Sequence, residues 1–523
     1  MPTILAIDLG TSGPKVALAT TEGRILGVEI GETGLIHFGA HGVEQDPAAW
    51  WGAIVTTTRR LLGRGLAPAE EIVGVVCTAQ WGGTVAVDAA GRPLGNAIIW
   101  MDARGARYMD QATGGRLKVA GYGVGKLVKW VQHAGGLPSH SGKDPTAHIL
   151  FLRHERPEVY AAAYKFLEPK DYLNLRLTGR FAASYDSIAL HWVTDNRQIN
   201  QVVYDDELLA LATLERAKLP DLKPAVEVLG PILPEVAAEL GLPPGASVVM
   251  GTPDLHSAAI GSGAIGDYAA HLYIGTSSWL SCHVPFKKTD VLHNMASLPS
   301  AVPGRYLLIN EQETAGACLA YLRDRLLFPR DALTPEGAPE GAYGLFDALA
   351  AGAPAGSDGL IFTPWLNGER APVDDHTARG GFHNLGLHHT RAHAIRAVME
   401  GVAFNTRWLH GYVETFIGRR LEAIHVIGGG ANSALWCQIL ADVLDRPIKQ
   451  VARPVEANAR GAAILAAVGL GYTTFEAAAQ QVTLAGEFEP NPQNRPIYDS
   501  LYAAFLNLYR RNKAIYARLN RQA

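Results

Sequence analysis

The sequence predicts an α/β fold built from two large domains. The chain has 523 residues, which is more than one ordinary hydrophobic core organises, and 48% of them are apolar, which is enough for two cores. Strand-like runs are interleaved with amphipathic helical segments, a pattern typical of sheets covered by helices. A Gly-Thr-Ser turn between two strand-like runs occurs once in each half, at 10–12 and at 275–277.

The first half begins with a hairpin. β-Branched and apolar residues predict strands on both sides of a turn that is rich in Gly, Ser and Thr. The helix that follows is predicted to have Asp46 as its cap and Pro47 at its first position. The predicted elements are a strand at 3–7, the turn at 8–14, strands at 15–19 and 25–30, the helix at 46–62 and a buried strand at 71–78.

The second half repeats this order, and we interpret the two similar turns as traces of an internal duplication. A Pro-, Gly- and Ala-rich segment at 333–359 is predicted to be an exposed excursion. The helix that begins near 433 has Asn432 or Ser433 as its predicted cap. The predicted elements are strands at 269–274, 279–284 and 423–427, a glycine run at 428–430, and helices at 433–444 and 460–470.

Composition favours a small-molecule partner. Lys and Arg total 46 against 50 Asp and Glu, and the net charge of -4 gives no electrostatic reason to expect binding to nucleic acid or to an acidic membrane surface. The four cysteines are scattered without a CxxC pair, so neither a disulfide framework nor a zinc site is indicated. No apolar run reaches membrane-spanning length, and we expect a cytoplasmic protein.

Asp254 stands near mid-chain among small residues. Gly251–Pro253 is read as a turn, and the small residues at 257–263 allow another part of the backbone to approach closely. Taken alone, this stretch is more typical of a surface turn that contains an aspartate. The two hairpins on either side favour a second interpretation, in which Asp254 lies at the junction of two domains.

The hairpin turns have the chemistry of phosphate sites. Backbone N–H groups and Ser or Thr hydroxyls on one concave side suit phosphate oxygens, and Lys15 adds a positive charge. Asp8, at the end of the first strand, is placed to hold Mg²⁺ directly or through water, although a hairpin aspartate that bonds its own turn fits the pattern as well. Neither turn matches GxxxxGK[ST]. The run Gly428–Gly430 fits either a nucleotide site at a helix N-terminus or a tight, closely packed connection.

Nine segments in order resemble the FGGY family of carbohydrate kinases, and most of all its xylulokinase-like branch. The resemblance runs from about residue 4 to about residue 470. The segments are AIDLGTSGPKVAL, HGVEQDPAAWW, IIWMDAR, LEPKDYLNLRLTG, GTPDLHSAAIGSGA, YIGTSS, FTPWLNGERAP, TRAHAIRAVMEG and VIGGGANSALWCQILADVL. The resemblance implies two ribonuclease H-like domains of the actin, hexokinase and Hsp70 type with the active site in the cleft between them. It divides the chain into a sugar-binding domain at 1–253 and an ATP-binding domain at 254–523, each with one phosphate hairpin.

The resemblance also implies a role for individual residues. Asp254 matches the catalytic base, which takes a proton from a sugar hydroxyl as that oxygen attacks the γ-phosphate of Mg-ATP. Positions that match sugar contacts are Gln80, Trp81, Trp100 and Asp102. Positions that match the phosphate hairpins and the adenosine side are Gly10, Thr11, Ser12, Lys15, Gly275, Thr276, Ser277, Gly316, Gly429 and Gly430. ATP and Mg²⁺ are the implied nucleotide and metal, a sugar or polyol is the implied partner, and a homodimer is left open.

Departures from the family pattern concern the sugar. Xylulokinases usually carry Met-His after the substrate-strand glutamine, whereas this chain has Trp81 and Gly82. A histidine donor to a sugar hydroxyl is therefore missing, and the segment 114–143, which lies next in the sequence to the predicted sugar contacts, matches the family poorly. We expect a kinase for a pentulose such as D-xylulose. D-Ribulose, L-ribulose, glycerol, another polyol or a sugar acid stays open as substrate, and a non-catalytic actin-type ATP and sugar sensor is the alternative of a different class.

Overall fold

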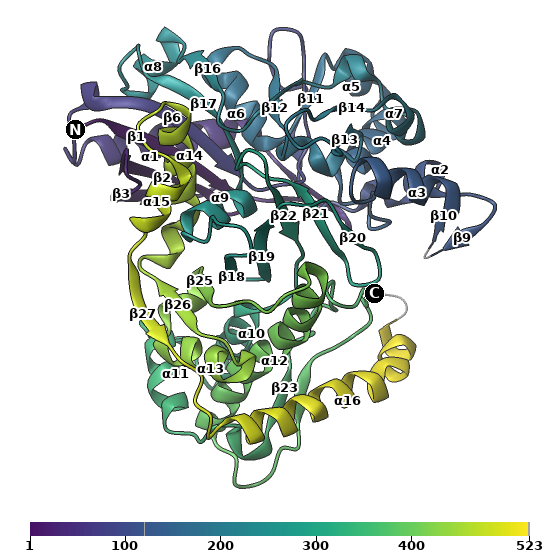
Figure 1. Ribbon diagram of the computed structural model, residues 1–523, viewed down its shortest axis with the longest axis vertical. Helices are drawn as coiled ribbons and strands as arrows, with labels where there is room; N and C mark the ends of the chain where they lie inside the picture. The colour runs from purple at the N-terminus through teal and green to yellow at the C-terminus, as the bar shows by residue number, and fades with distance from the viewer. Residues whose placement is uncertain (120, 521–523) are drawn as a thin grey trace.

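The computed structural model describes residues 1–119 and 121–520, and two large sheets organise these residues (Figure 1). The first sheet has six strands in the order β16-β17-β6-β1-β2-β3. The strand β1 pairs antiparallel with β2 and parallel with β6, and β6 pairs parallel with β17. The strands are β1 (Thr3–Gly10), β2 (Gly13–Thr20), β3 (Ile25–Ile30), β6 (Ile72–Ala79), β16 (Val228–Pro231) and β17 (Ser247–Pro253).

The second sheet has eight strands in the order β20-β21-β22-β19-β18-β25-β26-β27. Six of its strands, from β22 to β27 in this order, repeat the first sheet: β18 is antiparallel to β19 and parallel to β25, and β25 is parallel to β26. The repeated order confirms the predicted duplication. The strands are β18 (Ala270–Ile274), β19 (Ser278–Val284), β20 (Thr289–Asp290), β21 (Met295–Pro299), β22 (Tyr306–Ile309), β25 (Ile424–Ile427), β26 (Ile448–Val451) and β27 (Leu484–Phe488).

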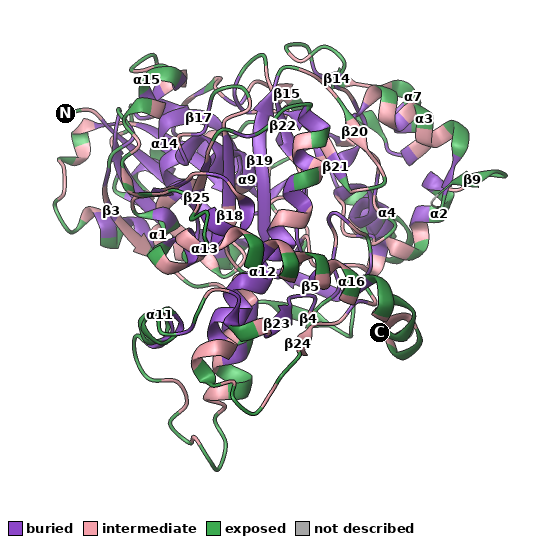
Figure 2. Cartoon of the chain, turned by 60° about the horizontal axis from the view of Figure 1, so that its bottom comes forward, coloured by how far each residue is buried: buried purple, intermediate pink, exposed green. Residues whose placement is uncertain are grey.

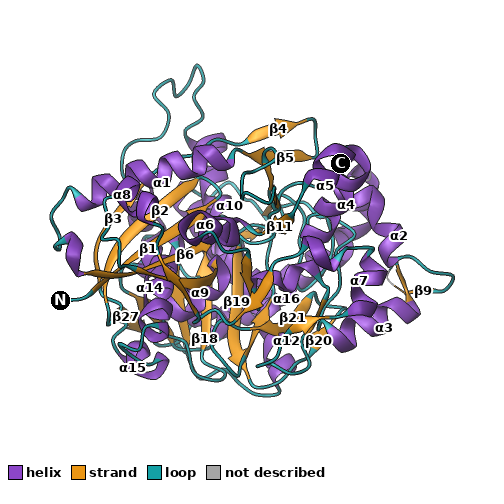
Figure 3. Cartoon of the chain, turned by 90° about the horizontal axis from the view of Figure 1, so that it is seen from above, coloured by secondary structure: helices purple, strands orange, loops and turns teal. Residues whose placement is uncertain are grey.

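Helices cover both faces of the first sheet. In Figure 3, α1 (Pro47–Leu62) and α8 (Pro234–Leu240) lie on one side of β1, β2 and β3, and α14 (Ala457–Gly469) lies on the other. Asp46 caps α1 as predicted, since its carboxylate accepts a hydrogen bond from Ala48 N. The other described helices of the first half are α2 (Met109–Thr113), α3 (Val124–His133), α4 (Pro145–Glu155), α5 (Pro157–Ala162), α6 (Pro169–Thr178) and α7 (Asp206–Ala212).

The helix α9 (Asp254–Gly261) packs against α14, and this pair lies between the two sheets. Apolar side chains of α14 share a core with β1, β2 and β6, whereas Leu255, Ala258 and Ala259 of α9 pack on the second sheet. Figure 2 shows α9, β18 and β19 buried together. The small residues at 257–263 thus serve close packing, because a Cβ on Gly261 would lie 1.8 Å from Ala457 O. Asp254, at the start of α9, therefore stands at the junction of the two halves.

The second sheet packs on long helices. Ser433 caps α13, since its hydroxyl accepts a hydrogen bond from Trp436 N. The C-terminal helix α16 runs along the outside of the second half (Figure 1) and buries Tyr498, Phe505 and Tyr509. The helices are α10 (Gly316–Tyr321), α11 (Ala342–Ala351), α12 (Arg391–Ile417), α13 (Ala434–Leu444), α15 (Phe475–Gln480) and α16 (Arg495–Asn520).

Short strands complete the architecture. They pair in small sheets outside the two large ones. These strands are β4 (Ile36–Phe38), β5 (Gly42–Gln45), β7 (Val85–Val87), β8 (Ala97–Ile98), β9 (Lys118–Val119), β10 (Tyr122–Gly123), β11 (Lys165–Leu167), β12 (Ala182–Ser184), β13 (Thr194–Asp195), β14 (Val203–Tyr204), β15 (Asp221–Lys223), β23 (Ile361–Thr363) and β24 (Gly381–His383).

Two local predictions were wrong. Gly251–Pro253 is the end of β17 rather than a turn, and Gly251 sits in a bulge with φ of +72° where a Cβ would lie 2.1 Å from Cys77 O. The segment 333–359 is not wholly an exposed excursion, because it forms α11 and buries Phe346 in the core. Among the described residues, no helix is long and apolar enough to cross a bilayer.

Candidate active site

The first hairpin turn, Thr11–Ser12 between β1 and β2, is held by side chains from three other segments. Thr11 Oγ1 donates to Gln80 Oε1 at 3.1 Å and accepts from Trp100 Nε1 at 3.0 Å, while Gln45 Nε2 donates to Thr11 O at 2.8 Å. Two predicted sugar contacts, Gln80 and Trp100, therefore touch the predicted phosphate turn. Their polar groups fix the turn, so a ligand would meet a preformed site.

Asp8 lies at the end of β1, and Lys15 is directly across from it on β2. Lys15 Nζ is 3.6 Å from Asp8 Oδ2 and donates to Val455 O at 2.8 Å, so the lysine links the first sheet to the segment before α14. Burial raises the pKa of Asp8, and the charge of Lys15 opposes that rise.

The second hairpin turn, Gly275–Ser277 between β18 and β19, is joined to the start of α10. Gly275 N donates to Ser277 O at 2.9 Å, Ala315 N donates to Thr276 O at 2.8 Å, and Gly316 N donates to Gly275 O at 2.8 Å. A Cβ on Gly316 would lie 2.5 Å from Gly275 O, so only glycine allows this approach. Gly316 therefore lies beside the second turn, and its predicted place in the lining of the nucleotide site stays a prediction.

The glycine run 428–430 reaches the same hairpin from the other side. A Cβ on Gly430 would lie 2.4 Å from Ile274 Cγ2, whereas one on Gly429 would meet open space. Gly429 opens a short 3₁₀ turn that leads from β25 to α13. Gly430 forms the tight contact of one interpretation, and Gly429 leaves room beside the strand; the nucleotide site of the other interpretation stays a prediction.

Asp254 faces charges from both halves of the chain. Burial and then the negative charges of Asp8 and Glu311 raise the pKa of Asp254 to about 7, while the hydrogen bond that Leu255 N donates to Asp254 Oδ1 at 2.8 Å opposes the rise. The same two aspartates, Asp254 and Asp8, add to the effect of burial on the Tyr273 hydroxyl, whose pKa rises to about 12. A carboxyl group with a pKa near neutrality beside two preformed turns has the properties of a general base.

The polar groups of the predicted sugar contacts Trp81 and Asp102 are already hydrogen-bonded within the protein. Trp81 is half-buried, donates its indole N–H to Ser187 O at 2.9 Å and stands edge-on to His256, with ring centroids 5.0 Å apart. Asp102 is buried, and its carboxylate accepts hydrogen bonds from Val43 N and from Arg104. The carboxylate of Asp102 is therefore already engaged by Val43 and Arg104, and its direct contact with a sugar stays a prediction.

Sequence reasoning assigned no role to a cluster of charged residues in the second half. Arg370 donates to Glu311 and Glu313, and its guanidinium lies 5.8 Å from the ring centroid of Trp100. Glu311 also raises the pKa of Asp254, which ties this cluster to the predicted base. The segment FTPWLNGERAP, which contains Arg370, was among the segments that carry the family resemblance. No sequence pattern connects Arg370 to Glu311, because the two residues are 59 positions apart.

The donor set near Asp8 fits a magnesium ion held mainly by phosphate oxygens and water. Among the described residues, no cluster of three or more His, Cys, Asp or Glu side chains could hold a metal on its own. Mg²⁺ commonly takes one or two carboxylates together with substrate phosphates and water. Asp8 supplies one carboxylate, and its repulsion with Asp254 is the kind that a bound cation relieves.

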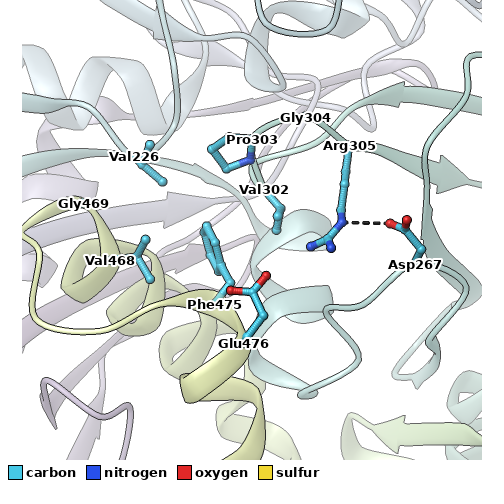
Figure 4. A pocket seen from close by; sticks show the side chains of 10 residues that line it. All are labelled: Val226, Asp267, Val302, Pro303, Gly304, Arg305, Val468, Gly469, Phe475 and Glu476. Carbon is cyan, nitrogen blue, oxygen red and sulfur yellow. Dashed lines mark hydrogen bonds and ion pairs between the residues drawn. The ribbon is translucent and has the colours of Figure 1, made fainter.

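A separate groove of about 620 Å³ lies beside the end of α14 (Figure 4). Arg305 and Asp267 form an ion pair at its edge, with Arg305 Nε 2.8 Å from Asp267 Oδ1. None of the predicted site residues lines it. We therefore place the candidate site at the hairpins and Asp254 rather than in this groove.

Two family models match the chain. The N-terminal domain of the FGGY family of carbohydrate kinases matches residues 3–261, and the C-terminal domain of that family matches residues 270–470. The chain belongs to the FGGY family of carbohydrate kinases. The fold prediction is thereby confirmed: the protein has the two-domain, actin- and hexokinase-like architecture of a sugar kinase.

Relatives in this family span the whole chain. A xylulose kinase from Staphylococcus epidermidis is 30% identical over 99% of this chain and 98% of its own length, and a xylulose kinase from Bacillus subtilis is 28% identical over 98% of each. Among solved structures, a gluconate kinase from Lactobacillus acidophilus aligns with a TM-score of 0.85 at 25% identity over 99% of both chains. The similarity to the xylulokinase-like branch is confirmed, and the chain is also similar to gluconate kinases.

Proposed function

We propose that this protein transfers the γ-phosphoryl group of ATP to a terminal hydroxyl of a pentulose, with D-xylulose as the first substrate to test. The observation that carries the proposal is Asp254, whose pKa of about 7 suits a base at neutral pH and whose neighbour Asp8 comes from the other half of the chain. The relatives named xylulose kinase support the substrate class.

In the proposed reaction, Asp254 accepts the proton of the attacking hydroxyl as that oxygen bonds to the γ-phosphorus, and the bond between the γ-phosphorus and the β–γ bridging oxygen breaks so that ADP leaves. The N–H groups and hydroxyls of Thr11, Ser12, Thr276 and Ser277 hold the phosphates from the two sides, and Lys15 adds a positive charge. Gly316 and Gly430 let neighbouring segments pack closely against the second turn, and Gly429 leaves room for the nucleotide. Bound Mg²⁺, with Asp8 as its protein ligand, would neutralise charge on the phosphate oxygens. Phosphoryl transfer needs mainly such positioning and charge neutralisation.

The test measures sugar-dependent ADP release by the purified protein with D-xylulose, D-ribulose, L-ribulose, glycerol and D-gluconate. We expect the highest kcat/KM with D-xylulose. A higher value with another compound would replace the substrate and keep the kinase. Binding of a sugar without ADP formation would instead select the sensor interpretation.

Asp254→Asn is the decisive variant. We expect kcat to fall roughly 10²- to 10⁴-fold, the usual contribution of a positioned acid–base group, while ATP still binds. The matched control is Asp206→Asn, which removes an exposed carboxylate from the first turn of α7 and should leave kcat unchanged. Near-normal turnover by Asp254→Asn would exclude the assigned role.

A further inference from the structure

Gly82 leaves a place beside the predicted sugar contacts where this chain has no side chain. A Cβ on Gly82 would lie 3.5 Å from Trp100 Cβ, 3.5 Å from Leu190 Cδ1 and 3.8 Å from Lys143 O. Gly82 has φ of +82°, a conformation that other residues adopt only with strain. The backbone itself therefore disfavours a side-chain donor at position 82, and any donor must come from a neighbour.

Lys143 is held in place next to this position by the residues on both sides of it. Gly142 packs against η2 (Arg104–Tyr108), where a Cβ would lie 2.2 Å from Ala106 N. Asp144 accepts hydrogen bonds from Ser139 N at 2.5 Å and from Trp192 Nε1 at 3.0 Å. The lysine thus extends from a fixed backbone, which suits a residue that must meet a ligand in one geometry.

Lys143 is half-buried and, within 1–119 and 121–520, its ammonium group forms no hydrogen bond or close ion pair. It lies within electrostatic reach of Arg370, Glu313 and Glu311, and burial lowers its pKa. Arg370 already pairs with both glutamates and lies over Trp100. Lys143 is therefore a partly desolvated hydrogen-bond donor beside the Arg370 cluster, which lies over Trp100, and its ammonium group has no hydrogen-bond acceptor among the described residues.

We propose that Lys143 binds the sugar and donates a charge-assisted hydrogen bond to one of its hydroxyls, taking the place of the donor that Gly82 lacks. This inference rests on the proposed sugar site. The charge of Glu311 acts on both Asp254 and Lys143, which links the lysine to the proposed base through the cluster that Arg370 holds together. Because Asp254 takes the reacting hydroxyl, Lys143 meets a hydroxyl that does not react, and it sets affinity and specificity without taking part in proton transfer.

The test compares the wild type with Lys143→Met, which keeps the length of the side chain and removes the charge. We expect the KM for D-xylulose to rise roughly 10- to 100-fold, the loss typical of a hydrogen bond to a charged group. The kcat and the KM for ATP should stay within about threefold, because the contact is equally strong in the ground state and the transition state. Lys143→Arg, which keeps a donor, should recover part of the affinity.

The matched control is Lys129→Met on α3, whose ammonium is exposed and pairs with Glu207 at 3.0 Å; this variant should behave as wild type. An unchanged KM for the sugar in Lys143→Met would overturn the inference. A lower kcat with an unchanged sugar KM would also overturn it and would assign Lys143 to pairing with Glu311 or Glu313 on domain closure.

Binding of D-xylulose measured by calorimetry without ATP separates this inference from the proposed function. In one outcome, Lys143→Met binds D-xylulose more weakly than the wild type, and the wild type binds the sugar but releases no ADP. This outcome would support the role of Lys143 and contradict the proposed kinase activity. Equal binding by a wild type and a variant that both turn over D-xylulose would sustain the kinase and reject the role of Lys143.

Discussion

At the scale of single residues, Asp254 as the proposed base should make the catalytic rate depend on pH. The base works only when deprotonated, and burial together with the charges of Asp8 and Glu311 holds its pKa at about 7. Below that pH the carboxyl group is protonated, so kcat/KM for the sugar should fall about tenfold per pH unit. The pH dependence of kcat/KM for the sugar, measured from pH 5 to 9 with saturating ATP, checks this expectation.

Asp8→Asn provides the control for the cause of the shift. Removing the negative charge of Asp8 lowers the pKa of Asp254, so the acid limb of the profile should move to lower pH while burial keeps it above the value of a free aspartate. The absolute rate should also fall, since Asp8 is the proposed magnesium ligand. An acid limb at the same pH in both proteins would contradict the electrostatic coupling of the two aspartates.

At the scale of elements, the contact between α9 and α14 decides where Asp254 stands. A Cβ on Gly461 would lie 1.8 Å from Ser257 O, so Gly461→Ala should push the two helices apart. We expect a loss of roughly 1–3 kcal/mol in stability, as for other overpacked cores, and a lower kcat because α9 carries the proposed base. Urea denaturation midpoints and steady-state rates measure the two effects.

Gly411→Ala in α12 is the matched control for that change. Gly411 is an exposed helical glycine with open space around its Cα, and alanine there should raise stability by about 0.4–1 kcal/mol without changing kcat. Equal denaturation midpoints for Gly461→Ala and wild type would show that the helices separate freely.

At the scale of the whole molecule, the two halves are interlocked. The helix α14 comes from the second half, yet its Ala463, Ile464 and Ala466 share a core with Ile4, Ala17 and other residues of the first sheet. A fragment of residues 1–253 would expose this apolar face. We expect that fragment to aggregate when expressed alone, and to become soluble when residues 254–523 are co-expressed. Solubility and size-exclusion profiles of the two preparations check the expectation.

A fragment 1–253 that unfolds cooperatively as a soluble monomer would contradict the interlocked arrangement. The boundary between residues 253 and 254 stays a proposal, since the family models end at 261 and begin again at 270. ATP and Mg²⁺ as reactants, and a homodimer as the assembly, likewise stay proposals.

The sequence by itself determined the local elements and the likeness of the two halves. Strand β3 and helices α1 and α13 follow from apolar periodicity and from caps that act over two or three residues, which a linear pattern can show. Only the tertiary structure decided that α14 covers the first sheet, that Asp8 and Asp254 interact, and that Lys143 stands beside Gly82 and near Arg370. The physical reason is that these contacts join residues 60 or more positions apart, where packing between sheets and helices selects the partner and no local pattern does.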